Sequence, residues 1–210
     1  MIRILVVDDH AILRRGLRDI LAHELEGVIC GEAGNAQEVV AQVQRQPWDL
    51  VILDITMPGR SGLDLLGDLK KLRPELPVLI LSMHPEDQYA RRMLKAGAAG
   101  YMNKETAPKE LVKAVRKVLA GGRYVSEALA EKLASDLSAG AANQYHETLS
   151  QREFEVLRMI ASGKTISQIA EELHLGVSTV STYRVRILEK LGMENNSELI
   201  RYALQNRLIE

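Results

Sequence analysis

Five polar side chains stand at or just beyond the ends of short apolar runs in the first half of the chain: Asp8, Asp9, Asp54, Ser82 and Lys104. Three carboxylates brought together repel one another unless a hard cation lies between them. Mg²⁺ suits a cage of carboxylate oxygens and water that leaves positions open for phosphate oxygens. A lysine ammonium and a serine hydroxyl suit the added charge of a phosphoryl group. We therefore expect a magnesium-assisted phosphoryl-transfer site where these residues meet.

The residue types also assign roles within this set. A carboxylate can form an acyl phosphate without a general base, so we expect Asp54 to be the nucleophile. The metal and Lys104 would neutralise charge on the transferring oxygens. Nothing in the sequence looks like a donor histidine, so the phosphoryl group must come from another molecule. Each residue alone has a plainer interpretation, such as a turn aspartate or a solvated lysine, and the prediction depends on the whole set.

Short, mostly unalternating apolar runs are typical of strands buried on both faces, and the first half contains five of them: Ile2–Val7, Val28–Glu32, Leu50–Leu53, Val78–Leu81 and Gly100–Met102. Stretches with helical spacing of leucine and valine separate these runs. This alternation predicts an α/β fold, a five-stranded parallel sheet with helices on both faces. Functional groups of such sheets gather at the carboxyl ends of the strands. The five polar side chains should therefore meet at one edge.

The second half of the chain is patterned as an all-α domain of four helices. Ser150-Gln151-Arg152-Glu153 predicts a capping box at the start of the first helix. A short helix over Ile166–Leu173, a glycine-containing turn and a longer helix that Ser178 should cap predict a helix-turn-helix. The last helix, Ser197–Asn206, carries an apolar stripe. That stripe is either a dimer contact or core packing.

Between the two halves, Ser126–Leu137 has helical spacing and is followed by small and polar residues typical of a linker. We expect one domain at residues 1–121 and another at 146–210, joined by a segment over 122–145 that contains this helix. The formal net charge is −1, so bulk charge does not draw the molecule to nucleic acid. The single cysteine, Cys30, excludes an internal disulfide.

The helix over residues 178–191 divides into two faces on a helical wheel, one of which is apolar and packs on the domain. The other face and its flanks carry short polar groups, cations, one valine and the acidic Glu189. The candidate DNA contacts among them are Ser178, Thr179, Ser181, Thr182, Arg184, Val185, Arg186 and Lys190. This mixture suits a DNA major groove, with hydroxyls at base edges and cations at phosphates. Val185 could touch a thymine methyl group or be a tolerated surface valine, and the wheel leaves both open.

Composition by itself does not point to DNA. Residues 146–210 contain two Lys and six Arg against nine Glu, and a solvated amphipathic helix would give a similar wheel. No signal-peptide pattern opens the sequence, and no stretch approaches the roughly 18 apolar residues of a membrane span. We therefore expect a cytoplasmic protein.

Residues 1–120 resemble a receiver domain of the CheY-like type in four stretches: Leu5–His10, Leu53–Gly59, Leu81–Ser82 and Gly97–Lys104. The resemblance implies that Asp54 is the phosphoacceptor, that Asp9 binds Mg²⁺ directly and that Asp8 acts largely through water. The backbone carbonyl of Thr56 is the implied third protein ligand. Ser82 and Tyr101 are implied to move inward together on phosphorylation, although Tyr101 alone could be an ordinary, partly buried strand aromatic.

Three stretches of the second half resemble the LuxR-type helix-turn-helix: Leu149–Glu153, Ile169–Leu173 and Val177–Leu191. Joined to a receiver, the whole chain is similar to a response regulator of the NarL/FixJ family. The resemblance implies a sensor histidine kinase as phosphoryl donor, double-stranded promoter DNA as target and a homodimer when phosphorylated. It implies no enzyme activity beyond assistance to the protein's own phosphoryl transfer.

Three positions depart from the family pattern. Met83 stands where receivers usually have a small residue, which bears on access of the donor. Glu105 stands where many receivers have proline, which puts the cis peptide common there in doubt. Ser181 replaces a frequent lysine, which removes one cation from the DNA-facing helix and bears on site preference.

Two other functions compete with a phosphorylation-controlled DNA-binding protein. An aspartyl-phosphate hydrolase would need a second acidic residue two positions after the nucleophile, where this chain has Thr56. A regulator that binds DNA constitutively, with the first domain serving only to dimerise it, stays open. Equal DNA affinity with and without phosphorylation would favour that second alternative.

Overall fold

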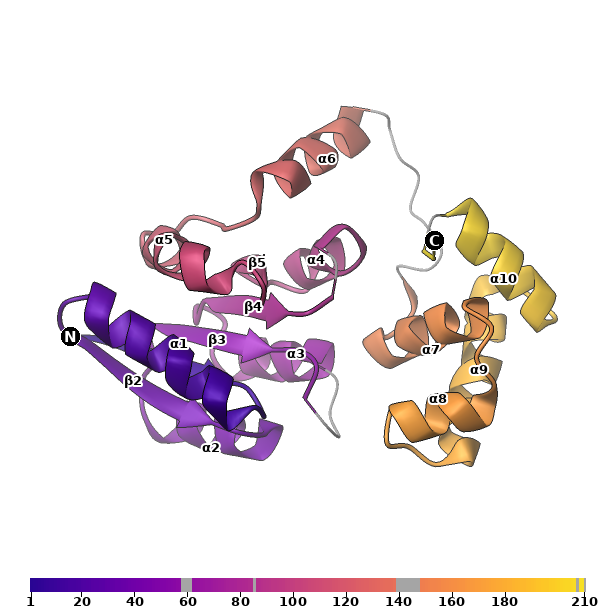
Figure 1. The fold of residues 1–210 in the computed structure, drawn as a ribbon, viewed down its shortest axis with the longest axis horizontal. Coiled ribbons are helices and arrows are strands. Elements are labelled where there is room, and N and C mark those ends of the chain that lie inside the picture. The colour runs from indigo at the N-terminus through magenta and orange to yellow at the C-terminus, as the bar shows by residue number, and fades with distance from the viewer. Residues whose placement is uncertain (58–61, 85, 139–147, 207, 210) are drawn as a thin grey trace. The chain divides into compact units, whose positions relative to one another are not determined.

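The structure is a computed structural model that describes residues 1–57, 62–84, 86–138, 148–206 and 208–209. Two compact units make up the chain, Met1–Ala139 and Gly140–Glu210, and most of their elements are labelled in Figure 1. Residues 139–145 of the predicted connecting segment lie outside the described residues.

The first unit is built on a five-stranded sheet whose strands are β1 (Ile2–Val7), β2 (Val28–Ala33), β3 (Leu50–Asp54), β4 (Val78–Ser82) and β5 (Gly100–Asn103). The strands are all parallel and lie in the order β2-β1-β3-β4-β5, which confirms the predicted sheet. Because this order places β1 and β3 side by side, the residues that end these two strands are neighbours in space.

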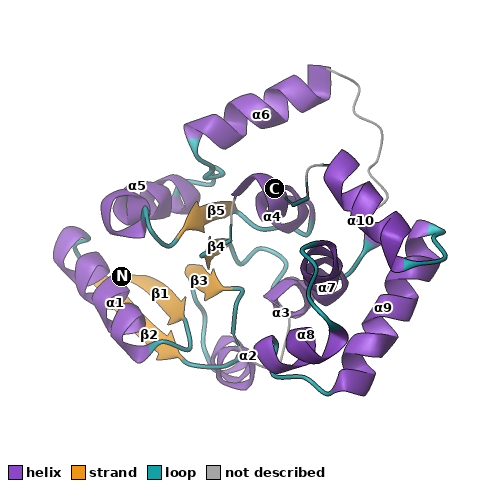
Figure 2. Cartoon of the chain, turned by 45° about the vertical axis from the view of Figure 1, so that its right-hand side comes forward, coloured by secondary structure: helices purple, strands orange, loops and turns teal. Residues whose placement is uncertain are grey.

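Helices cover both faces of the sheet, and their bounds are α1 (Ala11–Glu24), α2 (Ala36–Arg45), α3 (Gly62–Leu72), α4 (Glu86–Lys95) and α5 (Ala107–Leu119). Figure 2 shows α1 and α5 on one side of the strands and α2, α3 and α4 on the other. Consecutive residues of one strand, such as Ile4 and Leu5, are both fully buried, because they face opposite sides of the sheet and each side is covered by a helical layer.

After α5 the chain returns to the sheet. Tyr124 forms a parallel bridge to Gly100 of β5, with the N–H of Tyr101 donating to the Tyr124 carbonyl at 3.0 Å and the N–H of Tyr124 donating to the Ala99 carbonyl at 3.0 Å. These bonds partly cover the edge strand β5, whose N–H and C=O groups would otherwise lack partners. Helix α6 (Glu127–Ser138) follows and belongs to the first unit.

The second unit contains α7 (Gln151–Ala161), α8 (Ile166–Glu172), α9 (Val177–Leu191) and α10 (Asn196–Gln205). The capping box of α7 is present, with Ser150 and Glu153 each bonded to the other's backbone N–H. The prediction that Ser178 caps α9 is wrong. The helix begins at Val177 with extended Gly176 as its N-cap, so Ser178 already lies inside the first turn.

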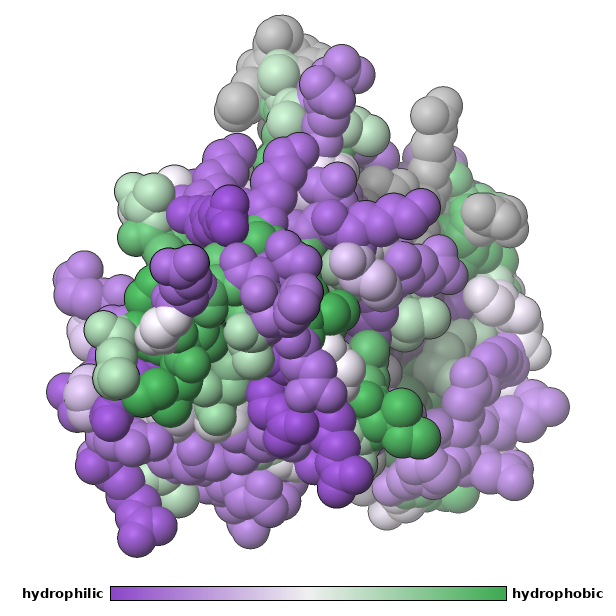
Figure 3. All heavy atoms as spheres, turned by 60° about the vertical axis from the view of Figure 1, so that its left-hand side comes forward, coloured by the Kyte–Doolittle hydropathy of each residue, from purple (hydrophilic) through white to green (hydrophobic). Residues whose placement is uncertain are grey.

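Most apolar side chains of the described residues are in the two cores. On the face seen in the space-filling view, hydrophilic side chains predominate and apolar ones gather in patches between them (Figure 3). A few large apolar side chains are nevertheless exposed, among them Ile12, Met83, Val185 and Leu204. None of the helices that the structure describes has the length and apolar character needed to cross a membrane.

Candidate functional site

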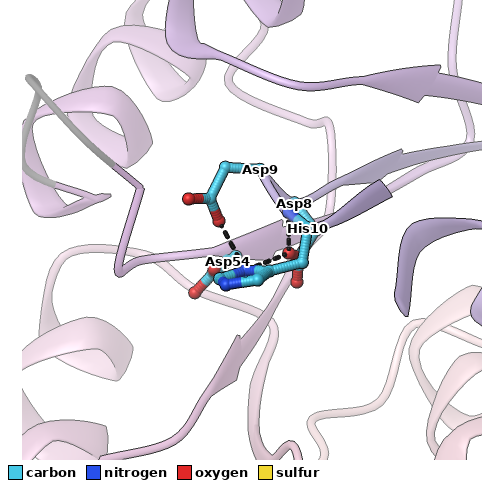
Figure 4. Close-up of side chains that lie close together, drawn as sticks. All are labelled: Asp8, Asp9, His10 and Asp54. Carbon is cyan, nitrogen blue, oxygen red and sulfur yellow. Dashed lines mark hydrogen bonds and ion pairs between the residues drawn. The ribbon is translucent and has the colours of Figure 1, made fainter. Parts of the chain in front are cut away.

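The predicted acidic residues meet at the carboxyl edge of the sheet. Asp8 directly follows β1 and Asp54 is the last residue of β3, and both side chains are completely buried. One ligand atom each of Asp8, Asp9, His10 and Asp54 lies within 4.8 Å of the others. Figure 4 shows these four side chains gathered in one place. The sequence-based expectation that the three carboxylates converge is therefore confirmed.

Lys104 joins two of these carboxylates. Its Nζ lies 2.7 Å from Oδ2 of Asp54 and 2.7 Å from Oδ2 of Asp8. Burial opposes the charge on this lysine, but the hydrogen bonds and charges of Asp54 and Asp8 outweigh burial and raise the pKa of Lys104. The ammonium group thus stays charged inside the site.

The neighbours of Asp54 compensate the negative charge of its carboxylate only in part. Its Oδ1 accepts a hydrogen bond from the backbone N–H of Thr56 at 2.8 Å, and Lys104 bonds to its Oδ2. Burial nevertheless raises the pKa of Asp54, and the charge of Asp8 adds to this effect. An additional cation next to Asp54 would therefore stabilise the ionised form that a nucleophile requires.

The donor set fits a hard divalent cation. Oδ2 of Asp8 and Oδ1 of Asp9 are buried, and their polar neighbours are Nζ of Lys104 at 2.7 Å and Nδ1 of His10 at 2.9 Å, respectively. Three carboxylates share the site with one buried ammonium group, which leaves net negative charge. Mg²⁺ would occupy such a cage of oxygens and keep several of its water molecules.

His10 lies in the acidic site, although it was not among the site residues predicted from the sequence. Its Nδ1 lies 2.9 Å from Oδ1 of Asp9 and 3.2 Å from Oδ1 of Asp8, and its own backbone N–H donates to Asp8 at 2.8 Å. His10 therefore helps to orient the two aspartates at the start of α1. Its position directly after the Asp8-Asp9 pair was the available signal.

Ser82 and Tyr101 are connected through the backbone of His84. The N–H of His84 donates to Oγ of Ser82 at 3.0 Å, and the hydroxyl of Tyr101 donates to the His84 carbonyl at 3.0 Å. The Tyr101 side chain is completely buried, and burial raises its pKa. The His84 ring also stacks on Tyr89, with ring centroids 4.4 Å apart. A movement of Ser82 would therefore change the contacts of His84 with Tyr101 and with Tyr89 of α4.

The departures at Met83 and Glu105 have simple structural outcomes. Met83 is 56% exposed, so its side chain does not fill the core. No cis peptide bond occurs among the described residues, and the bond between Lys104 and Glu105 is accordingly trans.

Helix α9 presents the predicted face to solvent. Val180 and Ile187 are fully buried, and Tyr183 and Leu191 are half-buried. The exposed set on this helix includes Ser178, Thr179, Ser181, Thr182, Val185, Arg186, Glu189 and Lys190. The division of α9 into a packed and an exposed face is therefore confirmed. DNA contact by these residues stays a prediction.

Two of the predicted cations already have partners inside the second unit. Nζ of Lys190 lies 2.6 Å from the buried carboxylate of Glu153, which joins α9 to the capping box of α7. Nε of half-buried Arg184 donates to the side-chain oxygen of Asn196 at 2.6 Å, at the start of α10. These bonds hold α9 against its neighbours. Arg186 is the more exposed arginine of α9.

Comparison with known proteins agrees with both units. The profile of the family described as response regulator receiver domain matches residues 4–116, and that of bacterial regulatory proteins, luxR family, matches residues 147–203. Response regulator GacA of Pseudomonas aeruginosa is 36% identical, with 100% of this chain and 99% of that protein covered. Response regulator UvrY of Escherichia coli strain K12 is 33% identical, with 99% and 96% covered.

A solved structure is similar over almost the whole chain. RcsB from Salmonella enterica serovar Typhimurium, bound to promoter rprA in the presence of the phosphomimetic BeF3⁻, has 28% sequence identity and a TM-score of 0.61. The match covers 96% of this chain and 98% of that one. With a receiver-type acidic site in one unit and a helix-turn-helix in the other, this chain belongs to the NarL/FixJ family of two-component response regulators.

Proposed function

We propose that a sensor histidine kinase phosphorylates Asp54 and that this modification controls binding of the C-terminal domain to double-stranded promoter DNA. The observation that carries the proposal is the position of Lys104 Nζ, 2.7 Å from both Asp54 and Asp8 at the carboxyl edge of the sheet. We assign residues 1–121 to the receiver domain, 122–145 to the connecting segment and 146–210 to the DNA-binding domain.

The phosphoryl transfer needs no general base from this chain. A carboxylate oxygen of Asp54 attacks the phosphorus atom of the phosphohistidine, and the P–N bond breaks. The electron pair stays on the imidazole nitrogen of the donor, which takes up a proton, and an acyl phosphate remains on Asp54. Lys104 is a fixed cation for the transferred oxygens, and Ser82 offers them a hydroxyl donor.

Mg²⁺ would be held by Asp8, Asp9, Asp54 and the Thr56 carbonyl, and it would neutralise charge on the transferring phosphoryl oxygens. The chain's own residues support that role, because burial leaves Asp54 short of compensating charge. Asp8 and Asp9 are oriented by the bonds from His10.

The added charge can affect the DNA-binding domain only if it changes a structural equilibrium of the protein. We propose that the added charge shifts a pre-existing balance between closed and open states through Ser82, the backbone of His84 and Tyr101. Released domains would dimerise on a two-fold related DNA site. Leu199 and Ala203 of the α10 stripe are buried in the core of the second unit, so exposed Leu204 is the candidate dimer contact of this helix.

Labelling with radioactive acetyl phosphate and Mg²⁺ tests the acceptor. The full chain should take up one acid-stable, hydroxylamine-sensitive phosphoryl group, and the Asp54→Ala variant should take up none. Asp64→Ala, which changes an exposed aspartate of α3, is the matched control and should be labelled normally. Label on Asp54→Ala would show that the acceptor is elsewhere, and many product molecules per protein would favour the hydrolase.

Selection from a random duplex library, with and without acetyl phosphate, tests the output. The phosphorylated wild type should enrich a two-fold symmetric sequence and bind it more tightly than the unphosphorylated protein or Asp54→Ala. Equal affinity of all three would contradict phosphorylation control and favour constitutive DNA binding.

A further inference from the structure

Thr182 presents a methyl group, rather than a hydroxyl group, on the exposed face of α9. Its Oγ1 donates to the backbone carbonyl of Ser178, one turn earlier, at 2.9 Å. A threonine hydroxyl has a single proton, and a helical threonine that donates to this carbonyl holds its side chain in one rotamer. The hydroxyl donor is thus used inside the helix, and the exposed residue offers its methyl group to a ligand.

Val185 extends this apolar surface. Its side chain is 48% exposed and lies three residues after Thr182, a spacing that makes side chains neighbours on a helix surface. The residues at 178 and 181 are exposed serines, so no bulky side chain of theirs shields it. Thr182 Cγ2 and Val185 together form what we name the methyl patch.

We infer that the methyl patch recognises the C5-methyl group of thymine in the major groove, an inference that rests on the proposed binding of α9 to DNA. The thymine methyl is the apolar group that base-pair edges present in that groove. A protein partner fits less well, because two small side chains fall far short of the roughly 800 Å² per partner of a stable interface. The exposed Arg186 next to Val185 offers a cation to the nearby backbone phosphates.

Replacement of thymine by deoxyuridine removes this one methyl group and nothing else. The probe is the duplex enriched from the random library, in which each thymine is replaced in turn, and the protein is the phosphorylated full chain. Burial of a methyl group corresponds to a roughly fourfold change in Kd. Wild type should lose about that factor at one or two thymines of each half-site and bind the other substituted duplexes as before.

Substitutions in α9 test whether the sensitive thymine contacts the methyl patch. Val185→Ala should bind the thymine and deoxyuridine duplexes almost equally at the sensitive position. Val177→Ala is the matched control, because Val177 is a valine of the same helix with 52% exposure. It lies eight residues earlier, which is about 12 Å along the axis, and should keep the fourfold ratio.

Thr182 separates methyl recognition from hydroxyl recognition. Thr182→Val keeps the methyl groups and should keep the deoxyuridine effect, whereas Thr182→Ser keeps the hydroxyl and should weaken it. The inference is overturned if wild type tolerates deoxyuridine everywhere, or if Val185→Ala stays as sensitive as wild type. Those results leave DNA binding intact, whereas failure to enrich any duplex would contradict the proposed function itself.

Discussion

At the scale of single residues, Lys104 determines whether the acidic site is stable without metal. Two of the carboxylates it contacts, those of Asp8 and Asp54, are completely buried. Removal of one partner from a buried ion pair leaves uncompensated charge, which costs more than the pair itself contributes. The same negative charge is what draws in a cation. We therefore expect the stability of the first unit and its proposed affinity for Mg²⁺ to be linked at this residue.

The Lys104→Met variant should make this link visible. In EDTA we expect its free energy of unfolding to be about 3 kcal/mol lower than that of wild type. Addition of Mg²⁺ should raise the free energy of unfolding more in the variant than in wild type. Urea unfolding followed by fluorescence of Trp48, a buried residue of the first unit and the single tryptophan of the chain, measures both quantities.

Lys113→Met provides the comparison, because exposed Lys113 forms a surface pair with Glu110 at 3.4 Å. Such pairs contribute little, so its free energy of unfolding should change by less than about 0.5 kcal/mol. A Lys104→Met protein as stable in EDTA as Lys113→Met would show that the two carboxylates are compensated by other means.

At the scale of elements, Glu153 connects the capping box of α7 to α9. Burial disfavours its charge, but the bonds from Lys190 and from Ser150 outweigh burial and hold the pKa of Glu153 below its ordinary value. The unfolded chain therefore binds this proton more readily than the folded one. The resulting stabilisation is complete above the ordinary glutamate pKa of about 4.3 and is lost as the pH falls through the folded-state pKa.

Glu153→Gln should lower the free energy of unfolding of the second unit by about 1 kcal/mol at neutral pH, by analogy with the loss of a cap. As the pH falls from about 5 through the folded-state pKa of Glu153, the variant should lose less stability than wild type. Urea titrations followed by the NMR amide signals of α7 report on this unit separately. Glu171→Gln, at an exposed glutamate of α8, should keep the wild-type pH dependence. If Glu153→Gln keeps the wild-type pH dependence of the free energy of unfolding, Glu153 is not the cause of that dependence.

In the segment between α5 and α6, the helix could be predicted from the sequence pattern but the long-range contacts could not. Helical spacing predicted α6 closely, because an amphipathic repeat is a local signal. The pairing of Tyr124 with Gly100 and Tyr101 was not predicted, because it depends on backbone bonds that join residues about two dozen positions apart. Ser126 adds a side-chain bond to Glu86 of α4, which no local pattern encodes either.

Ser126→Ala tests whether these bonds hold α6 in place. The hydroxyl accepts from the N–H of Leu129 at 3.2 Å and donates to Glu86, so its loss removes both a helix cap and a link to α4. We expect amide exchange in α6 to become about fivefold faster, which corresponds to about 1 kcal/mol. Hydrogen exchange measured by mass spectrometry should show no change in α2, and equal exchange in α6 would contradict the assignment.

The acidic site was more predictable than its surroundings for the same reason. Residues that end buried parallel strands share one edge, so Asp8, Asp54 and Lys104 could be placed together from strand order alone. The apolar runs ended before Asp54 and Ser82, yet both residues pair within the sheet, because the backbone ladder continues where the side chain turns polar. The internal partners of Arg184 and Lys190 depend on helix packing and could not be seen on a wheel.

At the scale of the whole molecule, charge is nearly balanced, with 27 basic and 28 acidic residues. Attraction to DNA through net charge is therefore weak, and affinity must come from a few placed cations. On α9, Lys190 forms an ion pair with Glu153 and half-buried Arg184 bonds to Asn196, whereas Arg186 is exposed next to Val185. Arg186 is thus the residue most suited to a phosphate.

Arg186→Gln should weaken binding to the selected duplex and to an unrelated duplex by a similar factor, because a phosphate contact carries no sequence information. The slope of log Kobs against log salt concentration should become shallower by about 0.9 for each protomer bound, since one counterion fewer is released. Arg201→Gln, which changes an exposed arginine of α10, is the charge-matched control and should keep the wild-type slope. A selective loss on the enriched duplex with no change of slope would instead place Arg186 on a base edge, and the phosphate contacts would then have to come from outside this helix.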